Sequence, residues 1–357
     1  MKFLARFRQQ GPEPDENYFP SLTVFIPAYN EENDIAAKLN SVLAQDYPQD
    51  KLEILVTSDV STDRTAEIVR SFAGRGVTLI ELTERHGKLG AIDRFLPEVK
   101  GEVIVVTDAN VMLGKDALRK LMAVYIDPSV GAASGYQTVE HPDQKTKLRE
   151  EVAYRTQEAL LKTILSRFGL LVGAFGGFYS IRRECFRPIG PKPMDDDIIL
   201  PLEAMAQGYK VVFVPEAVGY EAIGGTTTEE YRRRIRMTAY NFNAIGRAIR
   251  LGAKAGFGAL YVVFSYKILR WLAPFFWLSL ALSSLILSER SPLYSATALF
   301  FGIGFVAAGI GWLYSLQGKR IRICTQAYYF ALMNFATFPG LLHWLRGVKG
   351  YWGHRAA

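Results

Sequence analysis

Two acidic clusters in this sequence have the residue types and spacing to take part in chemistry. Asp108 and Asn110 stand two positions apart after an apolar run, where two oxygen side chains can converge on one hard cation. Asp195, Asp196 and Asp197 stand together before an apolar segment. Crowding of carboxyl groups raises the pKa of one and leaves a general base able to take a proton from a hydroxyl. Acidic residues also stabilise the first turn of an ordinary helix, so this cluster has a purely structural alternative.

Polar residues follow two further apolar runs and open a later helical segment. The turn 27–32 reads PAYNEE, and the turn 58–63 reads SDVSTD. Both suit the start of a helix, and Asp63 fits an N-cap better than Asp59, which follows its strand directly. Arg233 and Arg236 stand three apart, on one face of a helix. Arginines so placed can bind a diphosphate or anchor lipid headgroups.

Four short runs rich in β-branched residues precede these polar turns. They read LTVFI, EILVT, VTLIEL and EVIVVT, and each leads through a turn into a helical pattern. This alternation predicts a parallel sheet with crossover helices, which binds ligands at the carboxyl ends of its strands. No G-x-G-x-x-G motif follows the first run, and the sequence has no P-loop motif. A dinucleotide oxidoreductase and a P-loop NTPase therefore lose their main support.

Length and composition indicate two structural units with an ordered core. The chain has 357 residues, of which 49% are hydrophobic and 22% charged, which excludes disorder for most of it. Its two cysteines, Cys185 and Cys324, lie too far apart for a disulfide framework or a clustered zinc site. This usage suggests a reducing compartment for the catalytic part.

The net charge of +7 and the pI near 9.2 would suit nucleic acid or an anionic membrane. The apolar residues favour the membrane over nucleic acid, because two uncharged segments, about 271–288 and 292–317, are long enough to cross a bilayer. A third segment, 323–345, carries a Phe338-Pro339-Gly340 break, so a kinked span and a re-entrant hairpin both stay open. We expect no nucleic-acid partner, since the basic residues cluster beside the apolar segments.

Charge placement predicts the topology. Basic residues flank the two spans on their outer sides, whereas the link between them is nearly neutral, which puts residues 1–270 in the cytoplasm. Residues 1–20 are predicted to form a basic interfacial segment and a linker. The predicted domains are then 21–250 for catalysis, and 251–357 for an interfacial helix with two or three membrane segments.

Taken in order, these motifs resemble those of family 2 glycosyltransferases of the GT-A fold. The branch is the membrane-anchored one, which includes cellulose, chitin and hyaluronan synthases. The resemblance covers residues 22–237 and, more loosely, the later segments up to Trp352. It implies an α/β fold, in which a GT-A nucleotide-sugar-binding domain with a mainly parallel sheet is followed by C-terminal transmembrane helices.

The resemblance assigns donor-side roles by motif. Asp59 would accept the hydrogen bond of the uracil imide, and Lys88 of the G-K loop would lie near the diphosphate. Asp108 would ligate Mg²⁺ or Mn²⁺, with Asn110 as a neutral second ligand. The residues that would lie against the base and ribose belong to the first turn: Pro27, Tyr29, Asn30 and Glu32.

Acceptor-side roles follow in the same way. Asp196 and Asp197 match the family's acidic pair, with Asp197 as the base and Asp195 or Asp196 as the alternatives. Arg233 and Arg236 match a segment that reads Q-x-x-R-W in processive members. The second arginine is kept while the glutamine and the tryptophan are lost, so the chain departs from the processive pattern.

The resulting hypothesis is an inverting transferase at the cytoplasmic face of a bacterial inner or plasma membrane. It would move a sugar from a UDP-sugar to a hydroxyl of a lipid-linked or growing glycan. Single-sugar addition to a polyprenyl phosphate or glycolipid is the alternative within enzymes, and an inactive membrane scaffold is the alternative outside them. A homo-oligomer or a partner membrane subunit would supply the further helices that a translocating synthase needs.

Overall fold

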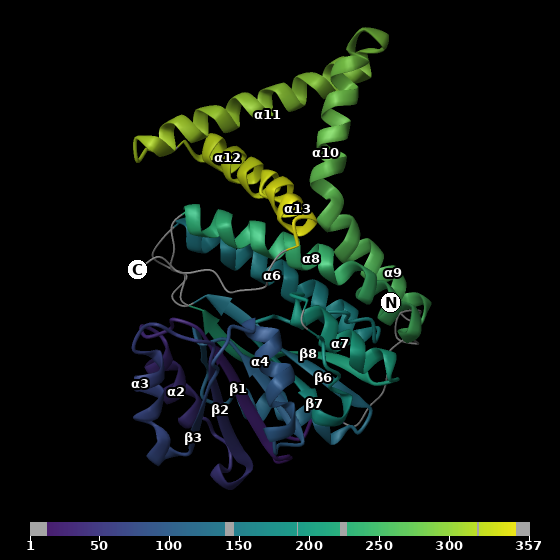
Figure 1. The fold of residues 1–357 in the computed structure, drawn as a ribbon. Coiled ribbons are helices and arrows are strands. Elements are labelled where there is room, and N and C mark those ends of the chain that lie inside the picture. The colour runs from purple at the N-terminus through teal and green to yellow at the C-terminus, as the bar shows by residue number, and fades with distance from the viewer. Residues whose placement is uncertain (1–12, 140–145, 191, 222–226, 320, 348–357) are drawn as a thin grey trace. The chain divides into compact units, whose positions relative to one another are not determined.

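The computed structural model describes residues 13–139, 146–190, 192–221, 227–319 and 321–347 (Figure 1). Most of the predicted N-terminal segment 1–20 lies outside this part of the chain. The protein divides into two compact units: the first is Met1–Gly224, Ala244–Val263 and Lys349–Ala357, and the second is Gly225–Asn243 and Phe264–Val348. Helix α8 (Thr227–Ala255) passes from the second unit into the first. The sequence-based limits 21–250 and 251–357 place their boundary inside this helix, and they stay a prediction.

The first unit is built on an eight-stranded sheet with the order β3-β2-β1-β4-β7-β6-β8-β5. The four predicted runs form β1 to β4, which pair in parallel as expected. Beyond β4 the sheet is mixed, since β7 pairs antiparallel with both β4 and β6. The strands are β1 (Leu22–Ala28), β2 (Leu52–Ser58), β3 (Val77–Glu81), β4 (Val103–Thr107), β5 (Val111–Leu113), β6 (Val130–Val139), β7 (Phe178–Arg182) and β8 (Lys210–Glu221).

Strand β1 extends to Ala28, two residues into the segment 27–32 that the sequence predicts to be a turn. Its pairing with β4 stops at Phe25, whereas its pairing with β2 continues to Ala28. Pro27 therefore lies where no amide donor to β4 is needed, which is the position a strand tolerates for proline.

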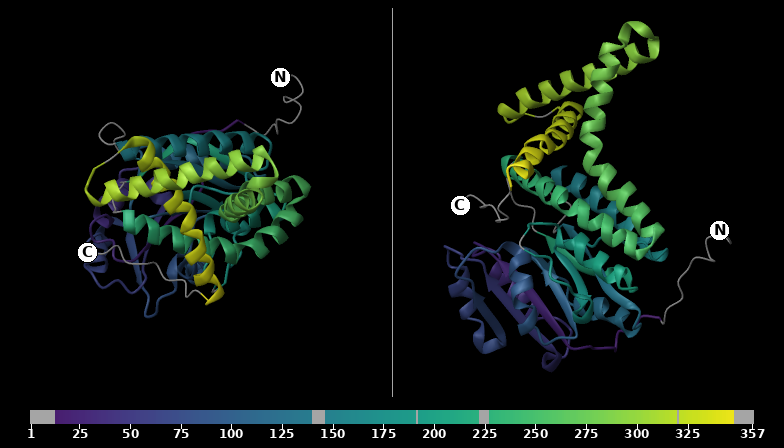
Figure 2. Two further views of the ribbon diagram at one scale, coloured as in Figure 1. Left: turned by 90° about the horizontal axis from the view of Figure 1, so that it is seen from above. Right: turned by 45° about the vertical axis from the view of Figure 1, so that its right-hand side comes forward.

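Helices cover both faces of the sheet (Figure 2). One core joins alternate residues of β1, such as Val24 and Ile26, to apolar side chains of α2, α3 and α5. The intervening residue Phe25 and its β4 partner Val106 are also buried, as expected for parallel strands between two helical layers. The helices are α2 (Ile35–Leu43), α3 (Thr65–Arg70), α4 (Gly87–Phe95), α5 (Ala117–Ala123), α6 (Thr146–Arg167), α7 (Asp196–Ala206) and α9 (Phe257–Val262).

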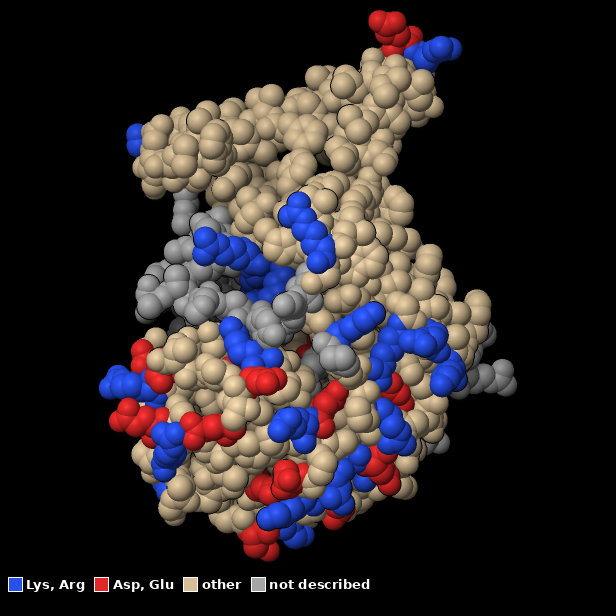
Figure 3. All heavy atoms as spheres, in the orientation of Figure 1, with Lys and Arg blue, Asp and Glu red and all other residues tan. Residues whose placement is uncertain are grey.

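The second unit is helical and apolar. A π-helical stretch (Val263–Ile268) begins at the last residue of the first unit and leads into α10 (Leu269–Ile286). The helices that follow are α11 (Pro292–Leu316), α12 (Arg322–Phe335) and α13 (Thr337–Leu345). Helices α11 and α12 approach closely, because a Cβ on Gly311 would overlap the carbonyl of Cys324. In Figure 3 the surface of α10 and α11 is almost free of Lys, Arg, Asp and Glu, whereas such residues crowd the first unit.

Two continuous helices among the described residues are long and apolar enough to cross a membrane. They are Phe257–Ile286 and Pro292–Leu316, and they contain the segments predicted from the sequence almost entirely. The third segment forms two shorter helices that part at Ala336, two residues before the expected break. Pro339 lies in the first turn of α13, where its missing N–H removes no helical hydrogen bond.

Candidate active site

The side chain of Lys88 lies at the meeting point of three segments that are distant in the sequence. Lys88 is the second residue of α4, and its Nζ donates to Asp108 Oδ1 at 2.9 Å and to the carbonyl oxygen of Gly176 at 2.8 Å. The same Nζ lies 3.2 Å from Asp196 Oδ2 at the start of α7. One ammonium group therefore joins the residue after β4 to the acidic helix, which are the two clusters singled out in the sequence.

This arrangement shifts the pKa values of its members. Burial acts to lower the pKa of Lys88, but the carboxylates of Asp108 and Asp196 outweigh it and raise that pKa above its ordinary value. Burial raises the pKa of Asp196, the charge of Lys88 opposes the rise, and the neighbouring Asp197 adds to it. The crowding of carboxyl groups predicted to raise a pKa is thus present, with Asp196 as the affected group.

Asp196 and Asp197 differ in their surroundings although they are neighbours. Asp196 is 8% exposed, and its Oδ2 accepts a hydrogen bond of 2.6 Å from the hydroxyl of Tyr179. Asp197 is half-buried, and its Oδ2 lies 3.5 Å from the place where a Cβ on Gly176 would be. Asp196 is thus held by Tyr179 and Lys88, while Asp197 faces a stretch of chain that has no side chain.

The sequence of α7 explains why these carboxylates stand at its start. Asp195 is the N-cap, and its carbonyl oxygen accepts the amide protons of Ile198 and Ile199. The acidic first turn is favourable because it faces the positive end of the helix dipole. The apolar residues that follow are buried, which fixes the rotation of the helix and so the direction of its first turn. The structural and functional interpretations of the acidic cluster are therefore compatible.

The turn from Asp108 to Asn110 rests on a buried lysine that the sequence analysis did not single out. Lys38 of α2 is completely buried, and its Nζ donates to Thr107 Oγ1 at 2.7 Å and to the carbonyl oxygen of Val111. Its two acceptors therefore bracket the turn. Burial lowers the pKa of Lys38 from 10.5 to about 7, and the nearby Asp108 carboxylate opposes this.

Asn110 belongs to a polar network at the end of β8. Its Nδ2 donates to Glu221 Oε1 at 3.3 Å. The other oxygen of Glu221 accepts from Gln137 Nε2 at 2.9 Å and from Arg155 at 2.6 Å. The side-chain amide therefore has a structural partner in addition to its predicted role as a metal ligand, and that role stays a prediction.

The first turn, expected beside the nucleotide base, carries a stacked pair. The guanidinium of Arg85 lies 3.6 Å from the centre of the Tyr29 ring, and Tyr29 is 7% exposed. Asn30 adopts a left-handed conformation at φ 54° and accepts the Thr62 amide proton at 2.8 Å. The sequence indicated Tyr29 but not Arg85, which stands after β3 without a recognisable motif.

The same turn is tied to the turn after β2. Glu32 pairs with Arg64 at 3.4 Å, and its amide donates to Asp63 Oδ2 at 3.1 Å. Asp63 also accepts the Thr65 amide proton at 3.0 Å at the start of α3, but the N-cap of that helix is Arg64, so Asp63 lies one residue before the cap position expected for it.

Asp59 anchors the loop that carries Lys88. Its two oxygens accept the amide protons of His86 at 2.7 Å and Gly87 at 2.9 Å, and the residue is 2% exposed. It therefore stabilises the N-terminus of α4 rather than that of α3. The predicted contact with a uracil ring stays a prediction.

Arg233 and Arg236 lie on α8 in the second unit, three residues apart as expected. Their roles toward a diphosphate or a lipid headgroup stay predictions.

The donor set around Asp108 fits a divalent cation of the Mg²⁺ type. The described residues contain no group of three or more His, Cys, Asp or Glu side chains that could enclose a metal. Such ions, however, commonly take one or two protein carboxylates and complete their shell with substrate phosphates and water. The three oxygens around the Lys88 ammonium show that this position favours positive charge.

Comparisons with known proteins agree with this fold. The Bacillus subtilis (strain 168) protein "Probable glycosyltransferase YdaM" is 29% identical over 255 residues, which are 66% of this chain and 59% of that protein. The Staphylococcus aureus (strain MSSA476) poly-beta-1,6-N-acetyl-D-glucosamine synthase is 22% identical over 230 residues, which are 63% of this chain and 55% of the synthase. The chain thus spans less than two thirds of these curated relatives.

Among solved structures, the mannosyltransferase PcManGT from Pyrobaculum calidifontis, in complex with GDP-Man and Mn²⁺, matches with a TM-score of 0.69. It is 24% identical, and the match covers 96% of this chain and 93% of that one, so the likeness supports the predicted GT-A fold. Residues 20–241 match the profile of the family described as "Glycosyltransferase like family 2". Because this match takes in more than half of the chain, the protein belongs to the family 2 glycosyltransferases.

Proposed function

We propose that the protein is an inverting glycosyltransferase that moves a sugar from a UDP-sugar to a hydroxyl of a lipid-linked or growing glycan. The observation that carries this is the Lys88 contact with both Asp108 and Asp196, at 2.9 and 3.2 Å. It brings the donor-side motif and the acceptor-side acids of the family to one point. A reaction between a diphosphate sugar and an acceptor needs these two groups of residues side by side.

In the proposed reaction Asp197 takes the proton of the acceptor hydroxyl. The oxygen then attacks the anomeric carbon as the bond from that carbon to the diphosphate breaks, and UDP leaves with the electron pair. Asp197 suits the base because it is half-buried and lies next to the bare backbone of Gly176, whereas Asp196 is engaged by Tyr179 and Lys88. A mobile acceptor can approach Asp197 more easily than a buried, doubly bonded carboxylate.

On the donor side, Asp108 with Asn110 would hold Mg²⁺ or Mn²⁺. When bound, that ion would offset negative charge on the diphosphate. Lys88 would supply a further positive charge there, and Arg233 and Arg236 are proposed to bind the same group. Tyr29, Asn30, Glu32 and Asp59 are proposed for the nucleoside, in the family's positions.

The donor base and the site of action are part of the proposal. The resemblance favours uracil, while the similar mannosyltransferase was solved with GDP-Man, so both donors belong in the test. The two apolar helices, Phe257–Ile286 and Pro292–Leu316, support a membrane location. The basic residues that flank them on their outer sides favour a cytoplasmic catalytic domain. A polyprenyl-linked or glycolipid acceptor would lie at that surface, which favours polysaccharide or glycolipid synthesis.

The test is nucleotide release by the purified, detergent-solubilised full chain. UDP-glucose, UDP-galactose, UDP-N-acetylglucosamine, UDP-glucuronate and GDP-mannose are each supplied with Mg²⁺, Mn²⁺ or EDTA, together with membrane extract as the acceptor source. We expect one donor to turn over with metal, and the activity to disappear in Asp108→Ala. Turnover of none of them would count against the proposed reaction and favour a missing partner subunit or the inactive scaffold.

Two matched variants assign the base. Asp197→Asn should abolish transfer while UDP binding is retained, because the amide cannot take the acceptor proton. Asp195→Asn keeps the backbone cap of α7 and should stay active. Loss of transfer in Asp195→Asn with full activity in Asp197→Asn would overturn the assignment. The length of the product distinguishes single addition from polymerisation.

A further inference from the structure

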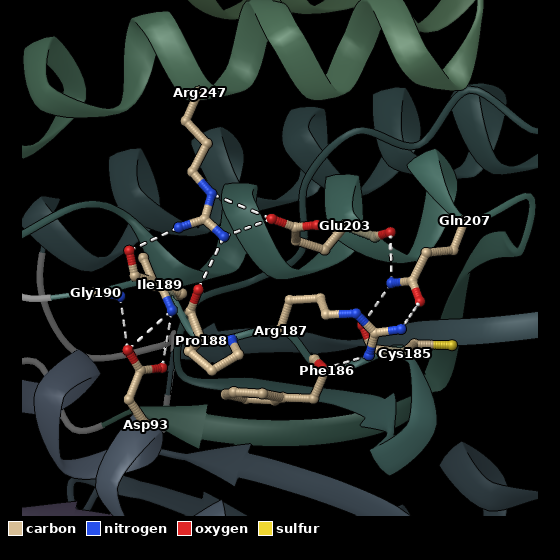
Figure 4. Close-up of polar contacts among 10 residues, drawn as sticks. All are labelled: Asp93, Cys185, Phe186, Arg187, Pro188, Ile189, Gly190, Glu203, Gln207 and Arg247. Carbon is tan, nitrogen blue, oxygen red and sulfur yellow. Dashed lines mark hydrogen bonds and ion pairs between the residues drawn. The ribbon is translucent and has the colours of Figure 1, made fainter.

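The backbone of residues 186–190, which lead from β7 toward α7, is bound by two side chains, Asp93 and Arg247, and a third side chain, Glu203, binds Arg247 (Figure 4). Asp93 comes from α4, Glu203 from α7 and Arg247 from α8. All three belong to the first unit. None of them carries a role in the reaction proposed above.

Arg247 makes the largest number of these contacts. Its guanidinium donates to the carbonyl oxygens of Ile189 at 2.6 Å and Pro188 at 3.0 Å. It also donates to Glu203 Oε1 from two nitrogens, at 3.1 and 2.5 Å. The Arg247 side chain is 18% exposed and that of Glu203 11%, so water screens this pair less than an ordinary surface pair. A planar guanidinium suits such contacts because its donors are fixed relative to one another.

Asp93 holds the same piece of backbone from the other side. Its carboxylate accepts the amide protons of Ile189 at 2.9 Å and Gly190 at 2.7 Å. The amide of Ile189 is thus bound by Asp93 while its carbonyl is bound by Arg247. Burial raises the pKa of Asp93, opposed by these two amides and by the charge of Arg247. Ile189 is therefore bound on its amide side by a side chain of α4 and on its carbonyl side by a side chain of α8.

Two of these three helices, α4 and α7, also carry the candidate active site. Lys88 lies five residues before Asp93 on α4, and Asp196 lies seven residues before Glu203 on α7. The helix starts touch through Lys88 and Asp196 at 3.2 Å. Their later turns are joined only indirectly among these contacts, through residues 186–190 and Arg247. A change in that connection would alter how α7 presents Asp196 and Asp197 to Lys88.

We propose that Arg247 and Asp93 are positioning residues that hold segment 186–190 and so set the place of the acidic start of α7 relative to Lys88. This rests on the proposed function, because Asp197 is the base assigned there. Neither residue touches the reacting atoms. Their effect would pass through the geometry of the acceptor side, where a displacement of about 1 Å can lower a rate about 100-fold.

The experiment compares Arg247→Met with Arg250→Met in the full-length protein. Arg250 is exposed on the same helix, three residues later, and serves as the matched control. Hydrogen exchange of the peptide that spans residues 184–195 reports on the contacts that Asp93 and Arg247 make with segment 186–190. UDP binding and transfer kinetics report on the candidate active site. We expect Arg247→Met to speed exchange at Ile189 and Gly190 and to lower the kcat of transfer at least about tenfold. UDP affinity should stay within about twofold.

Two more variants separate positioning from plain stability. Asp93→Asn should raise exchange at the same two amides and lower kcat in the same direction, since the neutral amide is a weaker acceptor. Arg247→Lys should recover part of the kcat, because a lysine can keep the charge contact with Glu203 but not the two carbonyl contacts.

The proposal is overturned if Arg247→Met transfers sugar as well as Arg250→Met, or if exchange rises evenly over the whole first unit. It is also overturned if the Ile189 and Gly190 amides exchange freely in the unaltered protein. Absence of transfer by the unaltered protein would refute the proposed function. The exchange data would still show whether Asp93 and Arg247 hold segment 186–190.

Discussion

The buried ammonium of Lys38 gives a prediction whose size can be worked out. Burial lowers the pKa of this side chain in the folded protein from 10.5 to about 7. The unfolded chain therefore binds more protons than the folded one between about pH 7 and 10.5. Stability rises with pH wherever the unfolded state binds more protons, so Lys38 should make the protein more stable as the pH increases through this window.

The change between pH 7 and pH 9 follows from the linkage relation. At pH 7 the folded lysine is about half protonated, and at pH 9 it is almost neutral, while the unfolded one stays protonated. Integration over this range gives a gain of about 2 kcal/mol in the free energy of unfolding. For a unit of this size that corresponds to an increase of roughly 4–8 °C in Tm.

The perturbation is Lys38→Met, which keeps the apolar length of the side chain and removes the titrating group. Tm of both proteins is measured at pH 7 and pH 9 in EDTA, so that no metal binds at Asp108. The difference between the two Tm values cancels effects of pH on the rest of the protein. From pH 7 to pH 9 we expect the Tm of the unaltered protein to rise by roughly 4–8 °C relative to the Tm of the variant. Lys51→Met, at an exposed lysine, should show no such change.

A pH-independent difference would refute this reasoning. It would mean that Lys38 keeps its proton up to pH 9, so that the Asp108 charge outweighs the effect of burial. Either result also bears on the site, because the variant loses the donors to Thr107 and Val111 that bracket the turn at Asp108. We therefore expect weaker transfer from Lys38→Met even where its Tm is higher, a trade between stability and activity that is common at functional sites.

Three further substitutions have defined outcomes. Val60 is a β-branched residue at φ 60°, so Val60→Gly should remove strain of about 1 kcal/mol and raise Tm by a few degrees, whereas a lower Tm would show that the turn is unstrained. Tyr179→Phe removes the hydroxyl that donates to buried Asp196 at 2.6 Å, and should lower stability by about 1–3 kcal/mol in chemical denaturation. Asn110→Asp places a carboxylate beside Glu221, so Tm should fall in EDTA and recover with Mn²⁺ more than in the unaltered protein; an equal response to Mn²⁺ would contradict a ligand role for residue 110.

The first half of the sheet could be predicted because its signals are local. Each of the four runs is a short apolar strand followed by a polar turn, and handedness and crossover rules leave few ways to arrange such units. The second half has no such pattern. Strand β6 contains Gly131, Ser134 and Gly135, and its partner β7 is reached only after the long helix α6. Pairing over such distances depends on packing that a single sequence does not display.

The candidate site, like the sheet, could be predicted only in part. Asp108, Asp196 and Asp197 could be identified because their motifs occur in the same order as those of a known family. Lys38 and Arg247 could not, since a lysine or an arginine on a helix is typical of an exposed surface. Only the fold reveals that Lys38 is fully buried and that Arg247 binds Glu203 and two carbonyl oxygens. For Asp59 the sequence predicted a hydrogen bond with the uracil imide. In the structure its carboxylate accepts two amide protons at the start of α4.

The position of Lys88 explains how so many acidic groups can be brought together. Asp108 and Asp196 come from separate elements, and a buried carboxylate without a partner costs several kcal/mol. Lys88 lies within 3.2 Å of both and is itself held by the Gly176 carbonyl, so one cation stabilises the donor side and the acceptor side together. Lys88→Met should therefore lower stability as well as transfer, and the loss of stability should be greater at pH 8 than at pH 4. At the lower pH the raised pKa of Asp196 lets that group take up a proton and lose its need for a counter-charge. An equal loss at both pH values would show that Lys88 contributes through packing rather than through charge.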